Sequence, residues 1–298
     1  MATLQGTGRR DATRGRGVGL SGLCALAALS GCQMIGGFDD LPLPSETTRL
    51  LNTPQWACLT GSDPPQPTRN VVEFRFEVVS GGSRQPLSDV KVRACNQLDT
   101  NCTAPAVDYT PVVDGVATVS LRDDFRGYFE IVSNDFVQAV EGQTGPYVPE
   151  IVAFSQRELL RGVGPDAVRR RTLMFTPAEV NALLAAVGGT YTLDARSNGV
   201  LIATALDCLS QPAPGVTFGV ASSGELAGPD SITFYNDARQ IPAPGQTETS
   251  DVGTFAQTGL FPGLVTLSSD VNALGRPLSD DVSIVLRDNW ATSVYVSP

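Results

Sequence analysis

Residues 72–78 alternate strictly between apolar and polar side chains. A β-strand that buries one face satisfies a period of two, so this segment predicts a strand. The same alternation returns at 90–94 and 117–121, and a further apolar stretch covers 128–132. Short turn sequences, such as DG at 114–115, separate these segments. The first part of the chain therefore predicts a β-meander.

A sheet with one apolar face has to cover that face with a second layer. Residues 70–155 are therefore predicted to form a β-sandwich. The second half of the chain returns to strand patterns, so we predict another sandwich at 197–298. Its expected strands cover residues 200–206, 216–220, 265–267, 282–286 and 292–296. The fold class that these patterns predict is mainly β, with two tandem Ig-like sandwiches.

One helix is predicted between the two halves, in a linker over residues 156–196. Residues 176–179 read TPAE, which has the spacing of a capping box with proline at the first helical position. Apolar residues follow at helical spacing, namely Val180, Leu183, Leu184 and Val187. Gly188 and Gly189 end the pattern, so the helix is expected at about 177–187. A single apolar stripe of this length packs against a sandwich.

The N-terminal end has the pattern of a signal peptide. Four arginines precede an apolar stretch at 18–29, and the stretch leads into small residues. This apolar core is shorter than the roughly 20 residues that a membrane-spanning helix needs. Residues 1–31 are therefore expected to be removed from the mature protein.

Residues 29–32 read LSGC, a tetrad that resembles the bacterial lipobox. In lipoproteins with this motif the cysteine receives a diacylglycerol and becomes the first residue after cleavage, so the resemblance implies that Cys32 is lipidated. Gln33 follows at the position where inner-membrane lipoproteins usually carry aspartate. The resemblance therefore implies the bacterial outer membrane, facing the periplasm or the cell surface. The alternative is an ordinary secretory signal with an incidental cysteine.

Residues 32–69 are rich in Gly, Pro, Ser and Thr and predict a flexible tether. One segment departs from this composition, at 55–59, where Trp56 stands near Cys58 in the sequence QWACL. A large aromatic side chain close to a cysteine indicates a segment that is held on a folded domain.

Four cysteines remain once the signal peptide is removed and Cys32 is acylated, and four cysteines permit three pairings. Cys95 and Cys102 bracket a six-residue polar loop, which favours their disulfide and leaves Cys58 to pair with Cys208. Export to an oxidising compartment agrees with disulfides. A zinc site is less favoured, because the spacing lacks the paired short knuckles of structural zinc sites. We expect no metal ion.

The two halves share a loose internal repeat. Residues 86–92 (PLSDVKV) parallel 212–218 (PAPGVTF), and both 110–116 and 249–255 contain a turn of the T-D-x-x-G-x-F kind. With the PG pair at 262–263, these motifs resemble those of the transthyretin-like, carboxypeptidase-regulatory-like β-sandwich family. The first copy departs from the family pattern, since it has SD where glycine is usual. The resemblance implies two transthyretin-like sandwiches that serve as accessory modules and not as catalysts.

The composition removes several classes of function. The chain has 298 residues and no histidine, which excludes Ser-His-Asp and Cys-His catalysis and His-ligated zinc. Cleavage before Cys32 removes four of the 21 basic residues and one of the 31 acidic residues, so the mature formal charge is −13. Such an acidic protein is a poor partner for nucleic acid. We interpret the basic run at 169–171 as a solvated turn or a salt-bridge partner.

Aromatic residues near predicted turns are the best candidates for a binding surface. They are Tyr109, Phe125, Tyr128, Tyr147 and Trp290. Exposed rings can stack on sugars or on a protein partner, so carbohydrate or another envelope protein is the expected ligand. The other interpretation is that these rings plug the ends of the sandwiches.

Paired carboxylates introduce the alternative of an enzyme, since glycoside hydrolysis uses two acids that flank the sugar bond. The pairs are Asp123-Asp124, Asp280-Asp281 and Glu248 with Asp251. Neighbouring residues on a strand point in opposite directions, so we interpret these acids as solvated turns. The loop at 95–102 lacks the repeated acids and fixed glycine of a calcium loop. Lys91 alternates onto the polar face of its strand, away from the buried site that an isopeptide bond needs.

These features predict a cell-envelope lipoprotein that acts as a binding or scaffolding module at the outer membrane, with no catalytic residue and no cofactor. Its partners would be the membrane, through the lipid anchor, and carbohydrate or an envelope protein. The alternative is a carboxylate-dependent enzyme that acts on a polysaccharide or cell-wall polymer. Such an enzyme needs a cleft with two convergent acids, one of them with a raised pKa, and this requirement separates the two hypotheses.

Overall fold

The computed structural model describes residues 46–60, 70–138, 143–156, 158, 170–188, 198–228 and 230–298. The predicted signal peptide, Cys32 and the first part of the predicted tether lie outside the described residues. No helix within the described ranges is long and apolar enough to cross a membrane. Residues Pro44–Pro298 form one compact unit.

The described chain is mainly β, which confirms the fold class that the alternation predicts. Its helical elements are α1 (Glu46–Leu51), η1 (Ala57–Thr60), α3 (Pro177–Ala186) and η2 (Asn272–Leu274). The strands of the first half are β1 (Val71–Ser80), β2 (Val90–Asn96), β3 (Val107–Pro111), β4 (Val116–Arg122), β5 (Gly127–Ser133), β6 (Val137–Gln138), β7 (Gln143–Thr144), β8 (Glu150–Phe154) and β9 (Arg170–Met174). The strands of the second half are β10 (Gly199–Ala205), β11 (Val216–Ser222), β12 (Thr233–Asn236), β13 (Pro242–Ala243), β14 (Thr254–Leu260), β15 (Gly263–Val271), β16 (Arg276–Pro277), β17 (Val282–Leu286) and β18 (Ala291–Val296).

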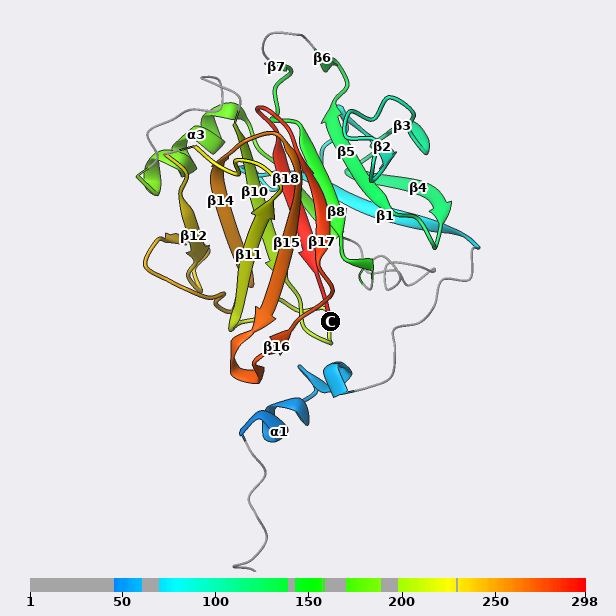
Figure 1. The fold of residues 1–298 in the computed structure, drawn as a ribbon. Helices are drawn as coiled ribbons and strands as arrows, with labels where there is room; N and C mark the ends of the chain where they lie inside the picture. The colour runs from blue at the N-terminus through cyan, green and yellow to red at the C-terminus, as the bar shows by residue number, and fades with distance from the viewer. Residues whose placement is uncertain are drawn as a thin grey trace, which may run out of the picture. The chain divides into compact units, whose positions relative to one another are not determined.

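Nine strands form one continuous sheet that joins the two halves of the chain (Figure 1). Its strand order is β13-β12-β14-β10-β18-β8-β5-β2-β3. The halves meet at β18, which lies parallel to β8 of the first half and parallel to β10 of the second half. The two sandwiches expected at 70–155 and 197–298 therefore share a sheet, because β18 completes its backbone hydrogen bonds on both edges.

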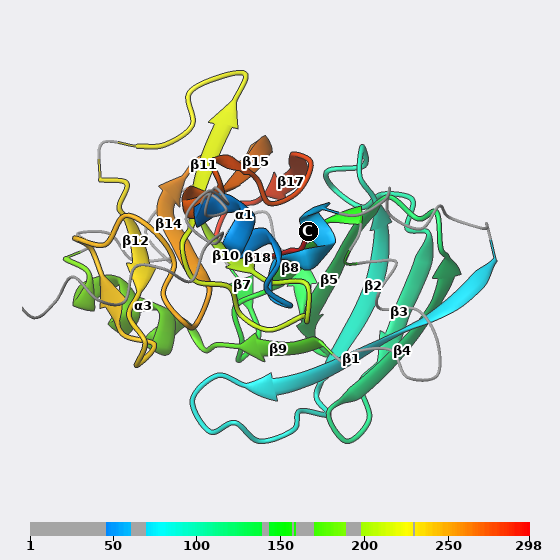
Figure 2. The same ribbon diagram turned by 90° about the horizontal axis from the view of Figure 1, so that it is seen from below.

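Two smaller sheets cover opposite faces of the nine-stranded sheet. One contains β4, β1 and β9, and the other contains β11, β15, β16 and β17. Successive side chains of β5 point alternately to the two faces of the large sheet. Phe129 and Ile131 belong to the core under β1, whereas Tyr128 and Val132 belong to the core under β15. Figure 2 shows the two small sheets on either side of the large one.

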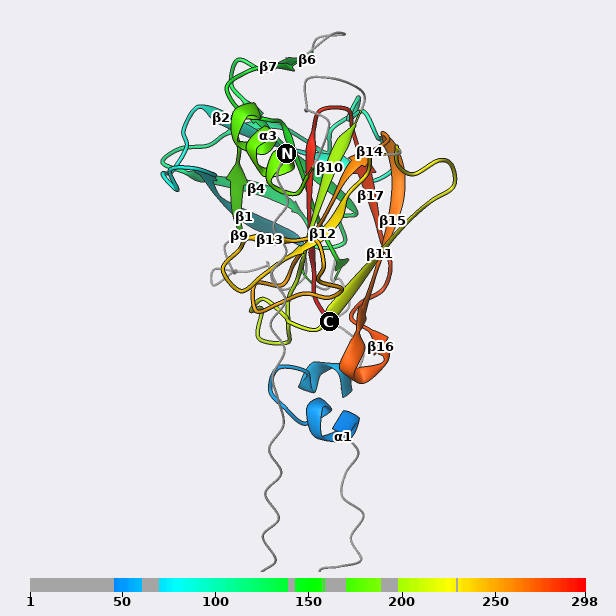
Figure 3. The ribbon, with the colours of Figure 1, turned by 90° about the vertical axis from the view of Figure 1, so that its left-hand side faces the viewer.

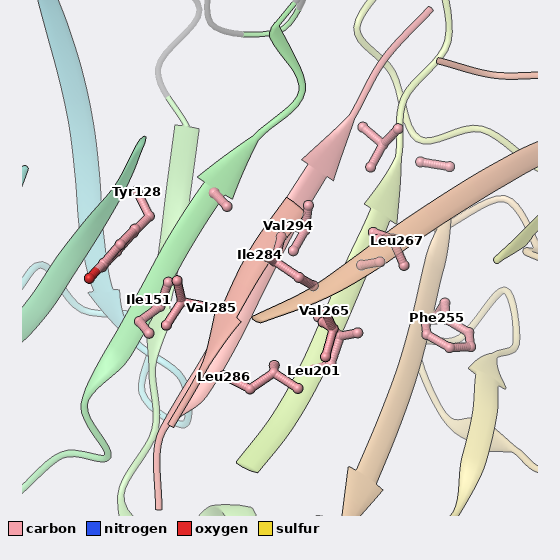
Figure 4. Close-up of a cluster of buried hydrophobic side chains, with 14 of the residues drawn as sticks. Tyr128, Ile151, Leu201, Phe255, Val265, Leu267, Ile284, Val285, Leu286 and Val294 are labelled. Carbon is pink, nitrogen blue, oxygen red and sulfur yellow. The ribbon is translucent and has the colours of Figure 1, made fainter. Parts of the chain in front are cut away.

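Each small sheet encloses a hydrophobic core against the nine-stranded sheet. The larger core, under β15, appears in Figure 4 and includes Leu201, Phe255, Leu267, Ile284 and Leu286. The smaller core, under β1, has an aromatic centre in which the rings of Phe76 and Phe129 meet edge-on with centroids 4.6 Å apart. Burial contributes about 1.5–3 kcal/mol for each large apolar side chain. Both cores therefore stabilise the shared sheet, from opposite sides.

Local sequence signals account for the turn at 114–115 and for the start of α3. Asp114 and Gly115 both have a positive φ, 49° and 76°, as a tight DG turn requires. The Thr176 hydroxyl accepts a hydrogen bond from the Glu179 backbone N–H, and the Glu179 carboxylate accepts one from the Thr176 N–H at 2.8 Å. This capping box confirms the helix predicted at about 177–187.

The segment before β1 is attached to the folded unit at the place that the sequence indicates. Trp56 is buried, and Cys58 forms a disulfide with Cys208. The Cys208 N–H donates to the Gln55 carbonyl at 3.0 Å. Residues 46–60 of the predicted tether are therefore part of the folded unit, because an aromatic side chain and a covalent bond hold them there.

Because the two cores share one sheet, we expect a single cooperative unfolding transition in guanidinium chloride. Phe129→Ala in the smaller core should lower the free energy of unfolding by about 3–5 kcal/mol, and Leu267→Ala in the larger core by about 2–5 kcal/mol. Both tryptophans, Trp56 and Trp290, lie in the larger core, so their fluorescence should report the lower midpoint of Phe129→Ala as well. Leu98→Ala, at a side chain that is 86% exposed, is the control and should leave the midpoint unchanged. A fluorescence midpoint that Phe129→Ala does not move would contradict the coupling of the two halves.

Candidate functional site

Half of one face of the nine-stranded sheet lies beyond the reach of the β1 sheet. Alternate residues of three strands point away from the larger core on this half. They are Val200, Ile202 and Thr204 of β10, Thr254, Ala256 and Thr258 of β14, and Ala291 and Ser293 of β18. Val180 and Leu184 of α3 pack against Val200. Figure 3 views the molecule from this side, with α3 and β12 beside β10 and β14.

A cavity of about 510 Å³ lies between this half of the sheet, which includes β12, and the elements α3 and β9. Its walls are mainly apolar and include Leu173, Phe175, Val180, Leu184, Val200, Ile202, Phe234 and Ala256. Pockets that hold small organic molecules usually span roughly 300–1,000 Å³ and combine apolar walls with a few polar groups. The cavity is therefore the candidate functional site.

Glu150 is the acidic residue in the wall of this cavity. It opens β8, and its backbone pairs with Ala291 on β18 and with Ile131 on β5. Only 4% of its surface is exposed. Its Oε1 forms a hydrogen bond with the Ser293 hydroxyl at 2.5 Å. Among the described residues, Ser293 is the side-chain hydrogen-bond partner of Glu150.

Burial raises the pKa of Glu150 to about 8, and the hydrogen bond with Ser293 opposes only part of this shift. A hydroxyl group cannot balance a full negative charge in an apolar wall, so the protonated form is favoured at neutral pH. A protonated carboxyl group can both donate and accept hydrogen bonds. Glu150 therefore offers a neutral polar contact inside a mainly apolar cavity.

Two exposed arginines, Arg84 and Arg171, also line the cavity. Arg84 follows β1, and Arg171 lies in β9, where its Nη2 is 3.1 Å from Glu77. This ion pair agrees with the interpretation of 169–171 as a salt-bridge partner. Among the described lining residues Glu150 is the one acid, and it is mostly uncharged at neutral pH. The charged side chains of this lining are therefore cationic at neutral pH, although Glu77 balances the charge of Arg171.

The structure corrects the prediction of a binding surface for three of the five aromatic side chains. Phe125, Tyr128 and Trp290 are buried, so their rings seal the turns onto the cores as the second interpretation expects. Tyr109 and Tyr147 are partly exposed, and neither of them lines the cavity. Nearness to a turn does not predict exposure, because a turn residue can point back into the core that the turn closes.

A buried cluster of charged side chains lies beside the Tyr128 ring. Glu130 is fully buried, and its carboxylate lies 2.5 Å from Arg93 Nε and 2.6 Å from Arg287 Nη2. Arg287 also donates to the Thr100 carbonyl at 2.8 Å and to the Tyr128 hydroxyl at 2.8 Å. The cluster joins β2 and β5 of the first half to the β17–β18 turn of the second half. Its role is structural, because each charge is held by a neighbour of opposite charge.

The structure contains both disulfides that the sequence favours, Cys58–Cys208 and Cys95–Cys102. The sulfurs of Cys95 and Cys102 lie within 4.8 Å of a Glu130 oxygen, but a disulfide provides no thiolate for a metal ion. In the same loop, hydrogen bonds from the Ala104 and Thr103 backbone lower the pKa of the Asp99 carboxyl. Asp99 therefore stabilises its own turn.

The carboxylate pairs of the enzyme hypothesis lie in three different places, and none of them lines the larger cavity. Asp124 is paired with Arg122 at 2.8 Å, and Glu248 accepts a hydrogen bond from Asn272 at 2.6 Å. Asp280 and Asp281 line a separate cavity of about 230 Å³. Lys91 is partly exposed, as its alternation predicts, and its Nζ donates to the Asn134 carbonyl at 3.0 Å.

The sequence patterns did not reveal Glu150. Residues 150–154 read EIVAF, an apolar run without alternation, because β8 is buried on both faces. A charged residue at the start of such a run is a weak signal of a buried acid, and only the pairing with β18 shows which face it occupies.

Comparisons with known proteins give no family assignment. No family model matches the sequence, and no curated protein matches it. The resemblance to the transthyretin-like family therefore stays a prediction.

Solved structures of bacterial proteins share weak structural similarity with the chain. The Bacillus anthracis TIE protein has 10% identity and a TM-score of 0.22 over 76% of this chain, which spans about a third (34%) of that protein. The shaft pilin SpaA from Lactobacillus rhamnosus GG has 9% identity and a TM-score of 0.23, with 77% of this chain and 98% of that chain covered. The minor pilin GBS52 from Streptococcus agalactiae has 12% identity and a TM-score of 0.24, with 79% and 91% covered. Similarity at this level assigns no function.

The raised pKa of Glu150 predicts how stability changes with pH. The folded state holds the proton up to about pH 8, whereas the unfolded chain releases it near the ordinary value of 4.5. The free energy of unfolding should therefore fall as the pH rises between these values, by up to about 1.4 kcal/mol for each pH unit, and should change no further through this group above that range. Urea unfolding at a series of pH values measures this slope.

Glu150→Gln should remove most of this decline, because an amide keeps the shape of the acid without its titration. Glu248→Gln is the matched control, since it changes an acid that lies outside the cavity. A slope that is the same in the wild type and in Glu150→Gln would contradict the assignment of the decline to Glu150.

Proposed function

We propose that this chain is a lipid-anchored protein of the bacterial outer membrane that binds an amphipathic, anionic small molecule in the cavity beneath α3. One observation supports the binding role above all others, namely a cavity of about 510 Å³ with apolar walls and arginine as its charged side chains at neutral pH. Apolar walls favour an apolar body, and Arg84 and Arg171 favour an anionic end.

The arginines at the cavity differ in charge from the rest of the protein, which is acidic. The mature chain carries a formal charge of −13, so an anion is repelled over most of the surface. Arginines at a cavity within such a protein give the anion a favourable place to bind. The lipid anchor rests on separate support, the LSGC tetrad at 29–32 after a short apolar core.

The enzyme hypothesis has one observation in its favour, the raised pKa of Glu150, which suits a general acid. Glycoside hydrolysis also needs a second carboxyl group about 5–10 Å from the first. The described residues of the cavity wall include no second acid. Turnover of a polysaccharide that Glu150→Gln abolishes would favour the enzyme over the binding protein.

Decanoate and decanol, used below the concentration at which they form micelles, test the proposed ligand class. Isothermal titration calorimetry on the mature chain with Cys32→Ser should give a Kd for decanoate about tenfold lower than for decanol, since one charged contact is worth roughly that factor. Replacing both arginines, Arg84→Gln with Arg171→Gln, should remove this difference. Arg122→Gln is the control, because Arg122 is also exposed and ion-paired but lies outside the cavity. Absence of binding by both probes, or equal affinity for them in the wild type, would refute the proposal.

Lipidation of Cys32 is tested by metabolic labelling in a bacterial host. Cys32→Ser should abolish incorporation of labelled palmitate into the protein, because the thiol is the acceptor. Cys24→Ser, which changes the cysteine inside the signal peptide, should leave the labelling unchanged. Labelling that persists in Cys32→Ser would rule out this anchor.

A further inference from the structure

Glu150 and Ser293 form a polar pair within the apolar part of the cavity wall. Both line the cavity, and they come from neighbouring parallel strands, β8 and β18. On the sheet the lining residues Val200, Ile202 and Ala291 beside them are apolar, whereas Tyr295, which follows Ser293 on the same face of β18, donates its hydroxyl to the Arg171 carbonyl at 3.0 Å. The pair is therefore a polar contact point in a mainly apolar wall.

The hydrogen-bonding capacity of this pair exceeds what the described protein groups use. A carboxyl group can take part in several hydrogen bonds, and Glu150 has one described partner, the Ser293 hydroxyl at 2.5 Å. A polar group that is 4% exposed costs free energy unless its capacity is satisfied. A polar group on a bound molecule would satisfy it from the side of the cavity.

We infer that the ligand carries, besides its anionic end, a neutral hydrogen-bonding group on its apolar body, and that this group binds between Glu150 and Ser293. This inference rests on the proposed function, since it concerns the same cavity. The chemical class is an acyl chain or similar apolar body with a hydroxyl or amide substituent. The arginines bind the charged end, and the buried pair selects among apolar bodies.

The alternative is that Glu150 acts as a counter-ion for an amine. The charged groups that face the cavity are Arg84, from the loop after β1, and Arg171, from β9, which is ion-paired with Glu77 of β1 at 3.1 Å; neither arginine favours a cation. In the described lining, α3, β10, β12, β14 and β18 contribute no charged side chain. A neutral partner for Glu150 is therefore favoured over a cationic one.

Three probes of equal chain length test the inference, namely decanoate, ω-hydroxydecanoate and ω-aminodecanoate. Calorimetry at pH 6 to 9 on the mature chain with Cys32→Ser should give a Kd for ω-hydroxydecanoate about five- to tenfold lower than for decanoate, the factor expected of one or two hydrogen bonds. The corresponding eight- and twelve-carbon pairs show whether chain length limits the contact.

Variants of the pair then locate the effect. Glu150→Leu and Ser293→Ala should each reduce the preference for the hydroxyl compound to about twofold or less, while decanoate still binds. Glu150→Gln should keep most of the preference, since an amide also donates and accepts, and it provides a folded variant if Glu150→Leu does not fold. Thr254→Val is the matched control, because it removes a cavity hydroxyl that already donates to the Val252 carbonyl at 3.0 Å.

The outcomes distinguish this inference from the proposed function. If none of the probes binds, the proposed function fails. If decanoate binds but the hydroxyl compound binds no better, or if Glu150→Leu and Ser293→Ala leave the preference intact, the inference fails while the proposed function stands. If ω-aminodecanoate binds most tightly and gains affinity as the pH rises, Glu150 is a counter-ion and the inference is overturned.

Discussion

Every strand of the nine-stranded sheet has two faces, and an apolar face costs free energy wherever water reaches it. The two small sheets cover opposite faces at opposite ends, so each face keeps one half without a second sheet. On one of these halves β2 carries Arg93 and β5 carries Glu130, whose carboxylate pairs with both Arg93 and Arg287. On the other half α3 provides the cover, and because a helix does not fill the same space as a sheet, a cavity remains.

Two buried glutamates show how the same residue type is accommodated on the two faces. Glu130 of β5 pairs across the strands with Ile151 of β8, and Glu150 of β8 pairs with Ile131 of β5, so the acids are close in the sheet but point to opposite sides. Glu130 has two arginines beside it, and ion pairs offset the cost of burying its charge. Glu150 has a hydroxyl partner, and its proton offsets the same cost. The surroundings, and not the residue type, decide which carboxyl group is available to a ligand.

Alternation and capping signals were sufficient for the individual strands of the first half and for the α3 helix, since each depends on residues close in sequence. The composition around Trp56 was sufficient for the attached segment. The predicted β-meander was wrong, because β1 and β4 pair in one sheet whereas β2 and β5 pair in another. The order of strands in the shared sheet could not be predicted in this way. It depends on β8, which is buried on both faces and therefore lacks alternation, and on β18, which pairs with strands from both halves. The candidate site follows from that pairing, because Glu150 and Ser293 are 143 residues apart in sequence. The prediction of exposed aromatic side chains failed for Phe125, Tyr128 and Trp290, because a position near a turn does not show in which direction the side chain points.

The Cys58–Cys208 disulfide has a mechanical consequence. A pulling force applied to the chain before Cys58 enters the folded unit at this bond and passes directly to Cys208, across a sequence separation of 150 residues. The strands β1 to β10 lie in the covalent loop that the bond closes, so they bear none of the tension along their backbone. A protein held by its N-terminal end could therefore be pulled and released repeatedly without extension of β8 or α3, whereas the cavity walls contributed by β12, β14 and β18 follow Cys208 and lie outside the covalent loop.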